Sequence, residues 1–170
     1  NVSRGSVISN SFITSIYLSG FTSTKPYLPW GGVTPRSNFE VEEIFLNSNK
    51  LFNVPSDILE KRLRDGLGLD CNWNCNFSYN EENIKSARFW MYQLYFLNPI
   101  TEDVSIPDTK INELLDRYQQ IKPNWLETKS DLVYFGQWEK QFSATDFTDD
   151  KNLKLLFNNS FAKIYKINND

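Results

Sequence analysis

The sequence of 170 residues contains no histidine. This absence removes the commonest general base and the commonest metal ligand at once. Serine–histidine and cysteine–histidine nucleophile systems are therefore excluded within this chain. The acidic run at residues 146–150 lacks the spacing of a calcium-binding loop, so we interpret it as a solvated turn. We accordingly predict no catalytic residue, no metal site and no cofactor.

Cysteine is almost absent as well, since Cys71 and Cys75 are the only two. Two thiols without histidine are too few for a structural zinc site. Their spacing, C-N-W-N-C, is not the C-x-x-C redox motif. Two interpretations remain open: two separate thiols, or a short disulfide in a loop, which would indicate an oxidising compartment.

Long apolar runs and strong net charge are also missing. The longest apolar runs are a few residues, so we expect no transmembrane helix within these boundaries. The net charge of −3 and the absence of a prominent basic patch predict no nucleic-acid partner. The chain begins at Asn1 and its only methionine is Met91. This predicts a segment or processed product of a longer protein.

What the chain does have is enough apolar material for a packed core, with 40% hydrophobic and 15% aromatic residues. Residues 5–10 are typical of a first strand. Residues 12–18 show helical spacing, and Gly20 is expected to end that helix. Residues 26–30 favour a second strand, which completes a unit of βαβ size.

The middle of the sequence is helical and is predicted to be an insertion at about residues 38–122. Ser37 and Glu40 fit a capping box at its start. Further helices are predicted at 57–67 and 84–96 and, from Asp108, on the spacing of Ile111, Leu114, Leu115, Tyr118 and Ile121.

The end of the chain returns to β character. Residues 131–138 favour a strand that stops at Gly136, and residues 153–157 and 161–167 favour a hairpin. The predicted fold for residues 1–170 is a single α/β domain. We expect three Rossmann-like layers and a mostly parallel sheet, closed by the C-terminal antiparallel hairpin.

Open α/β sheets bind ligands at the carboxyl ends of their strands. Right-handed crossovers would bring Asn10, a glycine pair and Gly136 to that edge. The glycine pair is neither G-x-G-x-x-G nor a P-loop, so a simple turn remains the alternative. The predicted ligand-binding residues are Asn10, Trp30, Gly31, Gly32, Arg36 and Gly136.

Four stretches carry a family resemblance: V-I-S-N at 7–10, K-P-Y-L-P-W-G-G at 25–32, D-L-V-Y-F-G at 131–136, and L-K-L-L-F-N-N-S-F-A-K-I-Y-K-I at 153–167. Together they resemble the soluble C-terminal domain of polytopic membrane proteins related to the lipid-linked-sugar glycosyltransferases. This is the dolichyl-phosphate-mannose-protein mannosyltransferase-like group. The prolines in the second stretch depart from the family pattern.

The resemblance implies an extracytoplasmic location, in agreement with the disulfide interpretation of Cys71 and Cys75. It implies a membrane-embedded part of the same chain as partner, with a glycan or lipid-linked sugar nearby. In that family the sugar-transfer chemistry lies in the membrane part, so no catalytic residue is carried over to this chain.

Three functions are therefore expected as alternatives. The first is a non-catalytic extracytoplasmic domain of a membrane glycosyltransferase-like protein that supports acceptor or partner binding. The second is a free-standing soluble α/β enzyme that binds a nucleotide or sugar at the sheet edge. The third is a structural interaction module.

Overall fold

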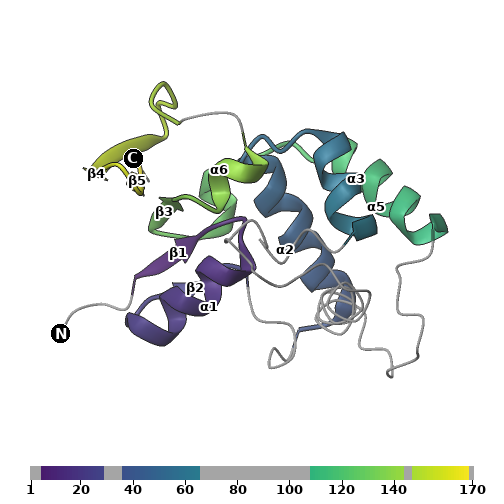
Figure 1. Ribbon diagram of the computed structural model, residues 1–170, viewed down its shortest axis with the longest axis horizontal. Helices are drawn as coiled ribbons and strands as arrows, with labels where there is room; N and C mark the ends of the chain where they lie inside the picture. The colour runs from purple at the N-terminus through teal and green to yellow at the C-terminus, as the bar shows by residue number, and fades with distance from the viewer. Residues whose placement is uncertain (1–4, 29–35, 66–107, 144–146, 169–170) are drawn as a thin grey trace, which may run out of the picture.

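The computed structural model describes residues 5–28, 36–65, 108–143 and 147–168 (Figure 1). It has a five-stranded mixed sheet, with the strands in the order β2-β1-β3-β5-β4. The predicted α/β class is therefore confirmed. The strands are β1 (Ser6–Ile8), β2 (Lys25–Pro26), β3 (Leu132–Phe135), β4 (Leu153–Asn158) and β5 (Lys163–Ile167).

The pairing of the strands differs from the expected parallel majority. β1 pairs in parallel with β2 and with β3, whereas β5 pairs antiparallel with β3 and with β4. Parallel neighbours need a long crossover, and antiparallel neighbours accept a short turn such as the one between β4 and β5. The pairing of β4 is irregular between Leu155 and Phe157.

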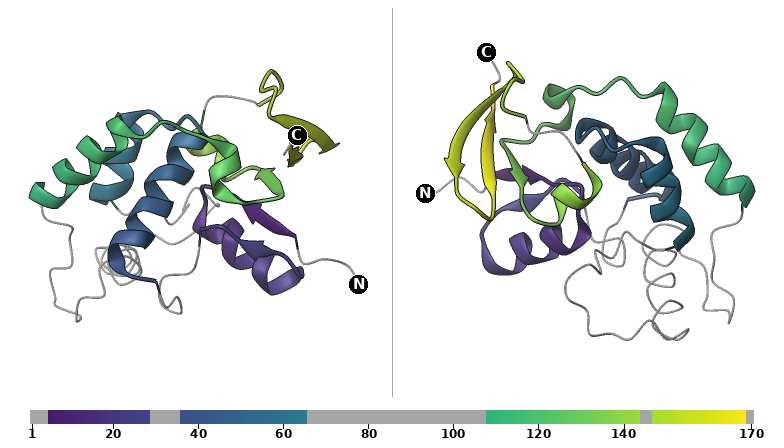
Figure 2. Two further views of the ribbon diagram at one scale, coloured as in Figure 1. Left: turned by 180° about the vertical axis from the view of Figure 1, so that it is seen from behind. Right: turned by 45° about the horizontal axis from the view of Figure 1, so that its top comes forward.

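Most of the helical structure lies between β2 and β3 in the sequence. The helices are α1 (Phe12–Phe21), α2 (Asn38–Leu51), α3 (Ser56–Asp65), α5 (Asp108–Gln120), the 3-10 helix η3 (Trp125–Thr128) and α6 (Glu139–Phe142). Figures 1 and 2 show α2, α3 and α5 gathered on one side of the molecule, with β4 and β5 on the other. In the described residues, no helix has both the length and the apolar character needed to cross a bilayer.

The helix ends test two predictions directly. The capping box is confirmed, because Ser37 Oγ accepts from Glu40 N and the Glu40 carboxylate accepts from Ser37 N at 2.8 Å. The prediction that Gly20 ends the first helix is wrong. α1 continues to Phe21, where the backbone N–H and the hydroxyl of Thr22 both donate to the carbonyl of Leu18.

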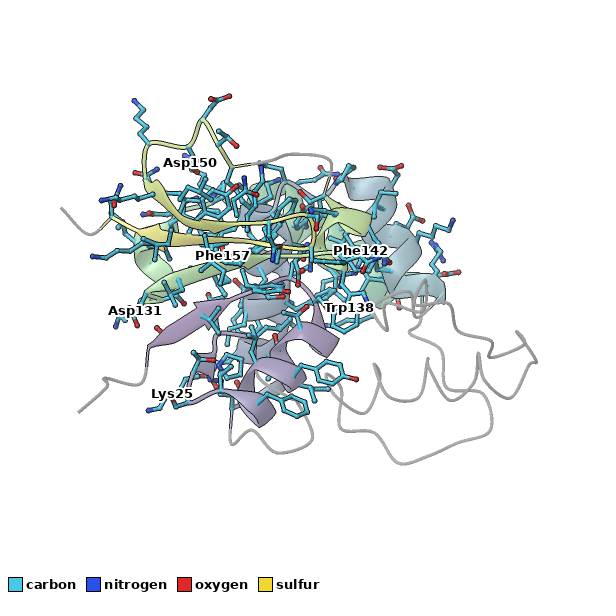
Figure 3. The ribbon with its side chains drawn as sticks, turned by 60° about the vertical axis from the view of Figure 1, so that its left-hand side comes forward. Lys25, Asp131, Trp138, Phe142, Asp150 and Phe157 are labelled. Carbon is cyan, nitrogen blue, oxygen red and sulfur yellow. The ribbon has the colours of Figure 1, made fainter. Side chains whose placement is uncertain are left out.

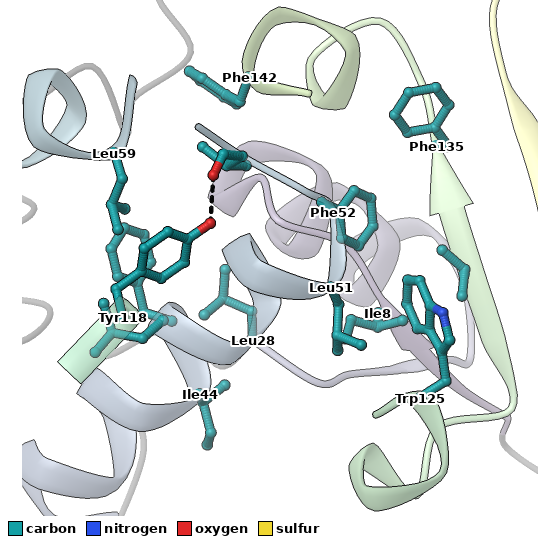
Figure 4. Close-up of a cluster of buried hydrophobic side chains, with 14 of the residues drawn as sticks. Ile8, Leu28, Ile44, Leu51, Phe52, Leu59, Tyr118, Trp125, Phe135 and Phe142 are labelled. Atoms are coloured by element: carbon teal, nitrogen blue, oxygen red, sulfur yellow. Dashed lines mark hydrogen bonds between the residues drawn. The ribbon is translucent and has the colours of Figure 1, made fainter. Parts of the chain in front are cut away.

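Charged and apolar contacts hold α5 against its neighbours. Arg117 forms ion pairs with Glu42 at 2.5 Å and with Glu43 at 2.6 Å, both on α2. Of the predicted apolar stripe, Ile111, Leu114 and Tyr118 are buried and the other two residues are partly buried. The Tyr118 hydroxyl donates to the Val54 carbonyl at 2.5 Å (Figure 4). Burial raises the pKa of Tyr118 to about 12.

The centre of the core is an aromatic cluster built around Phe147. Its ring makes edge-to-face contacts with four rings, at centroid distances of 5.2 Å to Phe52, 5.3 Å to Trp125, 5.2 Å to Phe135 and 5.8 Å to Tyr165. Figure 4 shows Phe52, Trp125 and Phe135 arriving from separate elements. One loop residue therefore joins α2, η3, β3 and β5.

The loop that contains Phe147 corrects the prediction of a solvated acidic turn at residues 146–150. Phe147 is 4% exposed, and Asp150 accepts a hydrogen bond from Trp125 Nε1 at 2.7 Å. Asp149 is exposed, as expected. Within the described residues, no group of three or more acidic, cysteine or histidine side chains could hold a metal ion.

Candidate functional site

The order in which the strands follow one another across the sheet reverses its direction at β1. From β1 the chain moves through α1 to β2 on one side, whereas β3 lies on the other side of β1. β1 and β3 are parallel, so their carboxyl ends lie side by side. Such a switch point is where open α/β sheets bind ligands. The prediction that Asn10 and Gly136 share an edge agrees with this arrangement.

A buried group of polar side chains fills this edge, and we call it the edge cluster. Its members are Ser9, Asn10, Ser11, Thr14 and Glu139, each at most 4% exposed. The Glu139 carboxylate accepts from Ser9 Oγ at 2.6 Å and from the backbone N–H of Gly136 at 2.8 Å. Ser11 caps α1 by accepting from Thr14 N. Glu139 therefore ties the end of β3 to the end of β1.

The buried environment of Glu139 disfavours the ionised form of its carboxyl group. Burial raises its pKa, which is the largest effect. Hydrogen bonds from Ser9 Oγ and from the backbone N–H of Gly136 lower the pKa without cancelling the effect of burial. Burial likewise raises the pKa of Tyr134, and the charge of Glu139 adds to that effect.

Arg62 reaches the edge cluster from α3. Its side chain is 0% exposed, and its Nη2 donates to the carbonyl of Asn10 at 3.0 Å. Nη1 donates to the side-chain oxygen of Asn49, and Cζ lies 3.8 Å from the ring centroid of Phe142. Arg62 thus connects α2, α3 and α6 to the end of β1.

Asn10, a member of the edge cluster, is fully buried. Its amide oxygen and nitrogen are both buried, and neither has a hydrogen-bond partner among the described residues. A buried amide without partners is unfavourable by about 1–3 kcal/mol. The amide oxygen could therefore accept a hydrogen bond from a ligand or a water molecule, and the amide nitrogen could donate one.

Three aromatic rings on the surface border the edge cluster, and we call them the surface aromatic stack. Tyr17 lies between Phe21, at 5.8 Å and 20° between planes, and Trp138, at 5.6 Å and 15°. Phe21 is 82% exposed and Tyr17 is 42% exposed. Figure 3 shows Trp138 beside α1. Trp138 immediately precedes Glu139 in the sequence, so the surface aromatic stack adjoins the edge cluster.

Gly136 is required by the close packing of Tyr134. A Cβ atom at position 136 would lie 2.5 Å from Cε1 and 2.7 Å from the hydroxyl of Tyr134. We expect Gly136→Ala to lower the free energy of unfolding by about 1–3 kcal/mol, because the tyrosine ring must move. Urea denaturation measures this loss.

A double-mutant cycle isolates the cause. In a Tyr134→Ala background the ring is absent, so Gly136→Ala should change the free energy of unfolding by no more than about 0.5 kcal/mol. An equal loss in both backgrounds would contradict a steric origin.

The remaining predicted site residues do not all lie in the described part of the chain. Arg36 is exposed next to Ser37. Hydrogen bonds from Ser37 lower the pKa of Glu40, and the charge of Arg36 adds a smaller effect. The other predicted residues, Trp30, Gly31, Gly32, Cys71 and Cys75, and the predicted helix at 84–96, lie outside the described residues.

Sequence reasoning missed Glu139, Arg62 and the surface aromatic stack. Arg62 lies between Leu59 and Leu63 on the apolar side of its helix, which is a signal for a buried charge. Tyr17 and Phe21 are four residues apart on α1, the spacing at which helical side chains meet. No family model, curated protein or solved structure gives a significant match to the chain.

Proposed function

We propose that the chain is a non-catalytic α/β domain of Rossmann-like type that binds a glycan or lipid-linked sugar at the carboxyl edge of β1 and β3. It would form the extracytoplasmic domain of a membrane glycosyltransferase-like protein. The observation that carries the sugar-binding part is the surface aromatic stack beside the edge cluster. The membrane attachment rests on the sequence resemblance.

Stacked, exposed aromatic rings suit a sugar ligand. A pyranose ring presents C–H groups on one face, which pack against an aromatic ring, while its hydroxyls need a few polar partners nearby. Phe21 is 82% exposed, and exposed apolar patches of this kind mark binding surfaces. The surface aromatic stack therefore supplies an exposed apolar platform next to the edge cluster.

The edge cluster supports binding more than chemistry. The Glu139 carboxylate is 0% exposed, and its two oxygens accept hydrogen bonds from Ser9 and Gly136. Glycoside chemistry ordinarily uses two carboxyl groups that face the scissile bond. We interpret Glu139 as a positioning residue that fixes residues 136–139, so that Trp138 lies against Tyr17.

One observation favours the second candidate, a free-standing soluble enzyme acting on a nucleotide or sugar. The buried Asn10 amide has no hydrogen-bond partner within the described ranges, and Glu139 has the raised pKa that a general acid needs. Consumption of a nucleotide sugar by the isolated chain, lost on Glu139→Gln, would favour this candidate over the first.

The sugar-binding proposal is tested by calorimetric titration with mannose- and glucose-containing oligosaccharides. We expect Phe21→Ala and Trp138→Ala each to weaken binding about tenfold, because each removes an outer ring of the surface aromatic stack. Phe39→Ala on α2 is the matched control, since Phe39 is 62% exposed and belongs to a different surface. Absence of binding across the panel, or an equal loss in the control, would overturn the proposal.

A further inference from the structure

The segment formed by β4 and β5 exposes more apolar surface than a solvated edge requires. Leu155, Leu156 and Phe157 on β4 are 44%, 54% and 48% exposed, and Phe161 in the connecting turn is 71% exposed. Contiguous exposed apolar residues of this size mark a contact surface. Figure 3 labels Phe157 at the strands β4 and β5.

Residues 151–168, which contain β4 and β5 and which we call the β4–β5 segment, have a charge opposite to that of the rest of the chain. Residues 151–168 contain four lysines and no acidic residue, giving +4. The whole chain carries −3, so the remainder carries −7. The lysines are Lys151, Lys154, Lys163 and Lys166; Lys163 is half-buried and the others are exposed. A separation of charge on this scale selects an anionic partner for this end of the molecule.

Strand register places lysine and apolar residues on one face. Lys154 pairs with Lys166, and Phe157 pairs with Ile164. Directly paired residues point to the same side of a sheet, and positions two apart along a strand share that side. Two lysines opposite each other repel. This face therefore presents a lysine pair beside an apolar pair, and the lysine pair is stabilised by an external negative charge.

A second copy of the chain is the less suitable occupant. β4 is an edge strand, but it carries Lys154 and an irregularity between Leu155 and Phe157, two features that oppose strand-to-strand pairing. Pairing two such edges would also bring together two sets of lysines. An anionic lipid surface matches both properties, because its headgroups attract the lysines and its interface accepts the apolar side chains.

We propose that the β4–β5 segment docks on the surface of an anionic lipid membrane. Lys151, Lys154 and Lys166 contact the phosphate headgroups, and Leu156 and Phe161 enter the interfacial region. The inference uses neither the edge cluster nor the surface aromatic stack, so it stands apart from sugar binding.

The experiment is co-sedimentation of the chain with two kinds of vesicle. One is made of phosphatidylcholine alone, and in the other phosphatidylglycerol supplies about a third of the lipid. Binding is expected to the anionic vesicles and to weaken with added salt. Replacing Lys151, Lys154 and Lys166 together by glutamine should weaken this binding about 100-fold, since each lysine contributes about fivefold.

Two matched controls separate the segment from general charge and general hydrophobicity. Glutamine at the exposed Lys25, Lys61 and Lys122 removes the same charge elsewhere and should leave most of the binding. The pair Leu156→Ser and Phe161→Ser should weaken binding about tenfold or more, whereas Leu126→Ser and Phe39→Ser should not.

Three outcomes would overturn the proposal. One is no sedimentation with anionic vesicles, and another is equal sedimentation with phosphatidylcholine alone. The third is a dimer in solution, lost on Leu156→Ser and Phe161→Ser, in a chain that does not bind vesicles. All substituted positions in the segment are exposed, so a circular dichroism spectrum unchanged from that of the parent chain is expected for each variant.

Discussion

Replacing Phe147 with alanine is expected to lower the free energy of unfolding by about 3–5 kcal/mol. The phenylalanine is 4% exposed and its ring touches four other aromatic rings, so truncation removes apolar burial and leaves a cavity. The lining rings belong to α2, η3, β3 and β5, which are separate elements and collapse poorly into the space. Chemical denaturation by urea, followed by circular dichroism, measures the loss.

The matched control is the same substitution at Phe161, which is 71% exposed. There we expect a change within about 0.5 kcal/mol, because an exposed ring has little burial to lose. Similar values at positions 147 and 161 would show that the loop packs more loosely than the aromatic cluster indicates.

Arg62→Ala should destabilise the fold by about 1–3 kcal/mol for each buried acceptor that loses its donor. The substitution removes donors to the Asn10 carbonyl and the Asn49 side chain, both fully buried, and removes the packing of the guanidinium on Phe142. Buried acceptors left without donors are the main cause of the loss.

Arg62→Met separates the two causes. Methionine keeps an unbranched stem against Phe142 but supplies no donor, so we expect a loss between those of the parent and the alanine variant. Lys61→Ala, at the exposed neighbouring position, should change the free energy of unfolding by less than about 0.5 kcal/mol. Equal stability of Arg62→Ala and the parent chain would contradict a structural role for the guanidinium.

Local patterns allowed much of the fold to be predicted. The capping box of Ser37 and Glu40 depends on neighbours three residues apart, and the stripe of α5 depends on helical spacing. Gly20 shows the limit of such signals. Glycine permits a helix to end, but the hydrogen bonds from Thr22 to Leu18 determine where α1 does end.

The candidate site was predictable only where chain topology determines it. Asn10 and Gly136 follow parallel neighbouring strands, so a crossover argument brings them to one edge. Glu139 and Arg62 gain their roles from partners far along the chain, Ser9 and Asn10, at separations of 130 and 52 residues. Phe147 was hidden in an acidic run, because composition does not reveal which member of a polar loop turns inward.

The long separation between β1 and β3 also has a consequence for the order in which the protein is made. Ser6 at the start of β1 bonds Asp131, and Ser9 bonds Glu139, at separations of 125 and 130 residues. β1 therefore cannot pair with β3 until most of the chain has left the ribosome. Contacts this distant slow folding, because a large loop must close before they form. The edge that we assign to ligand binding is thus completed only after Glu139 has been synthesised.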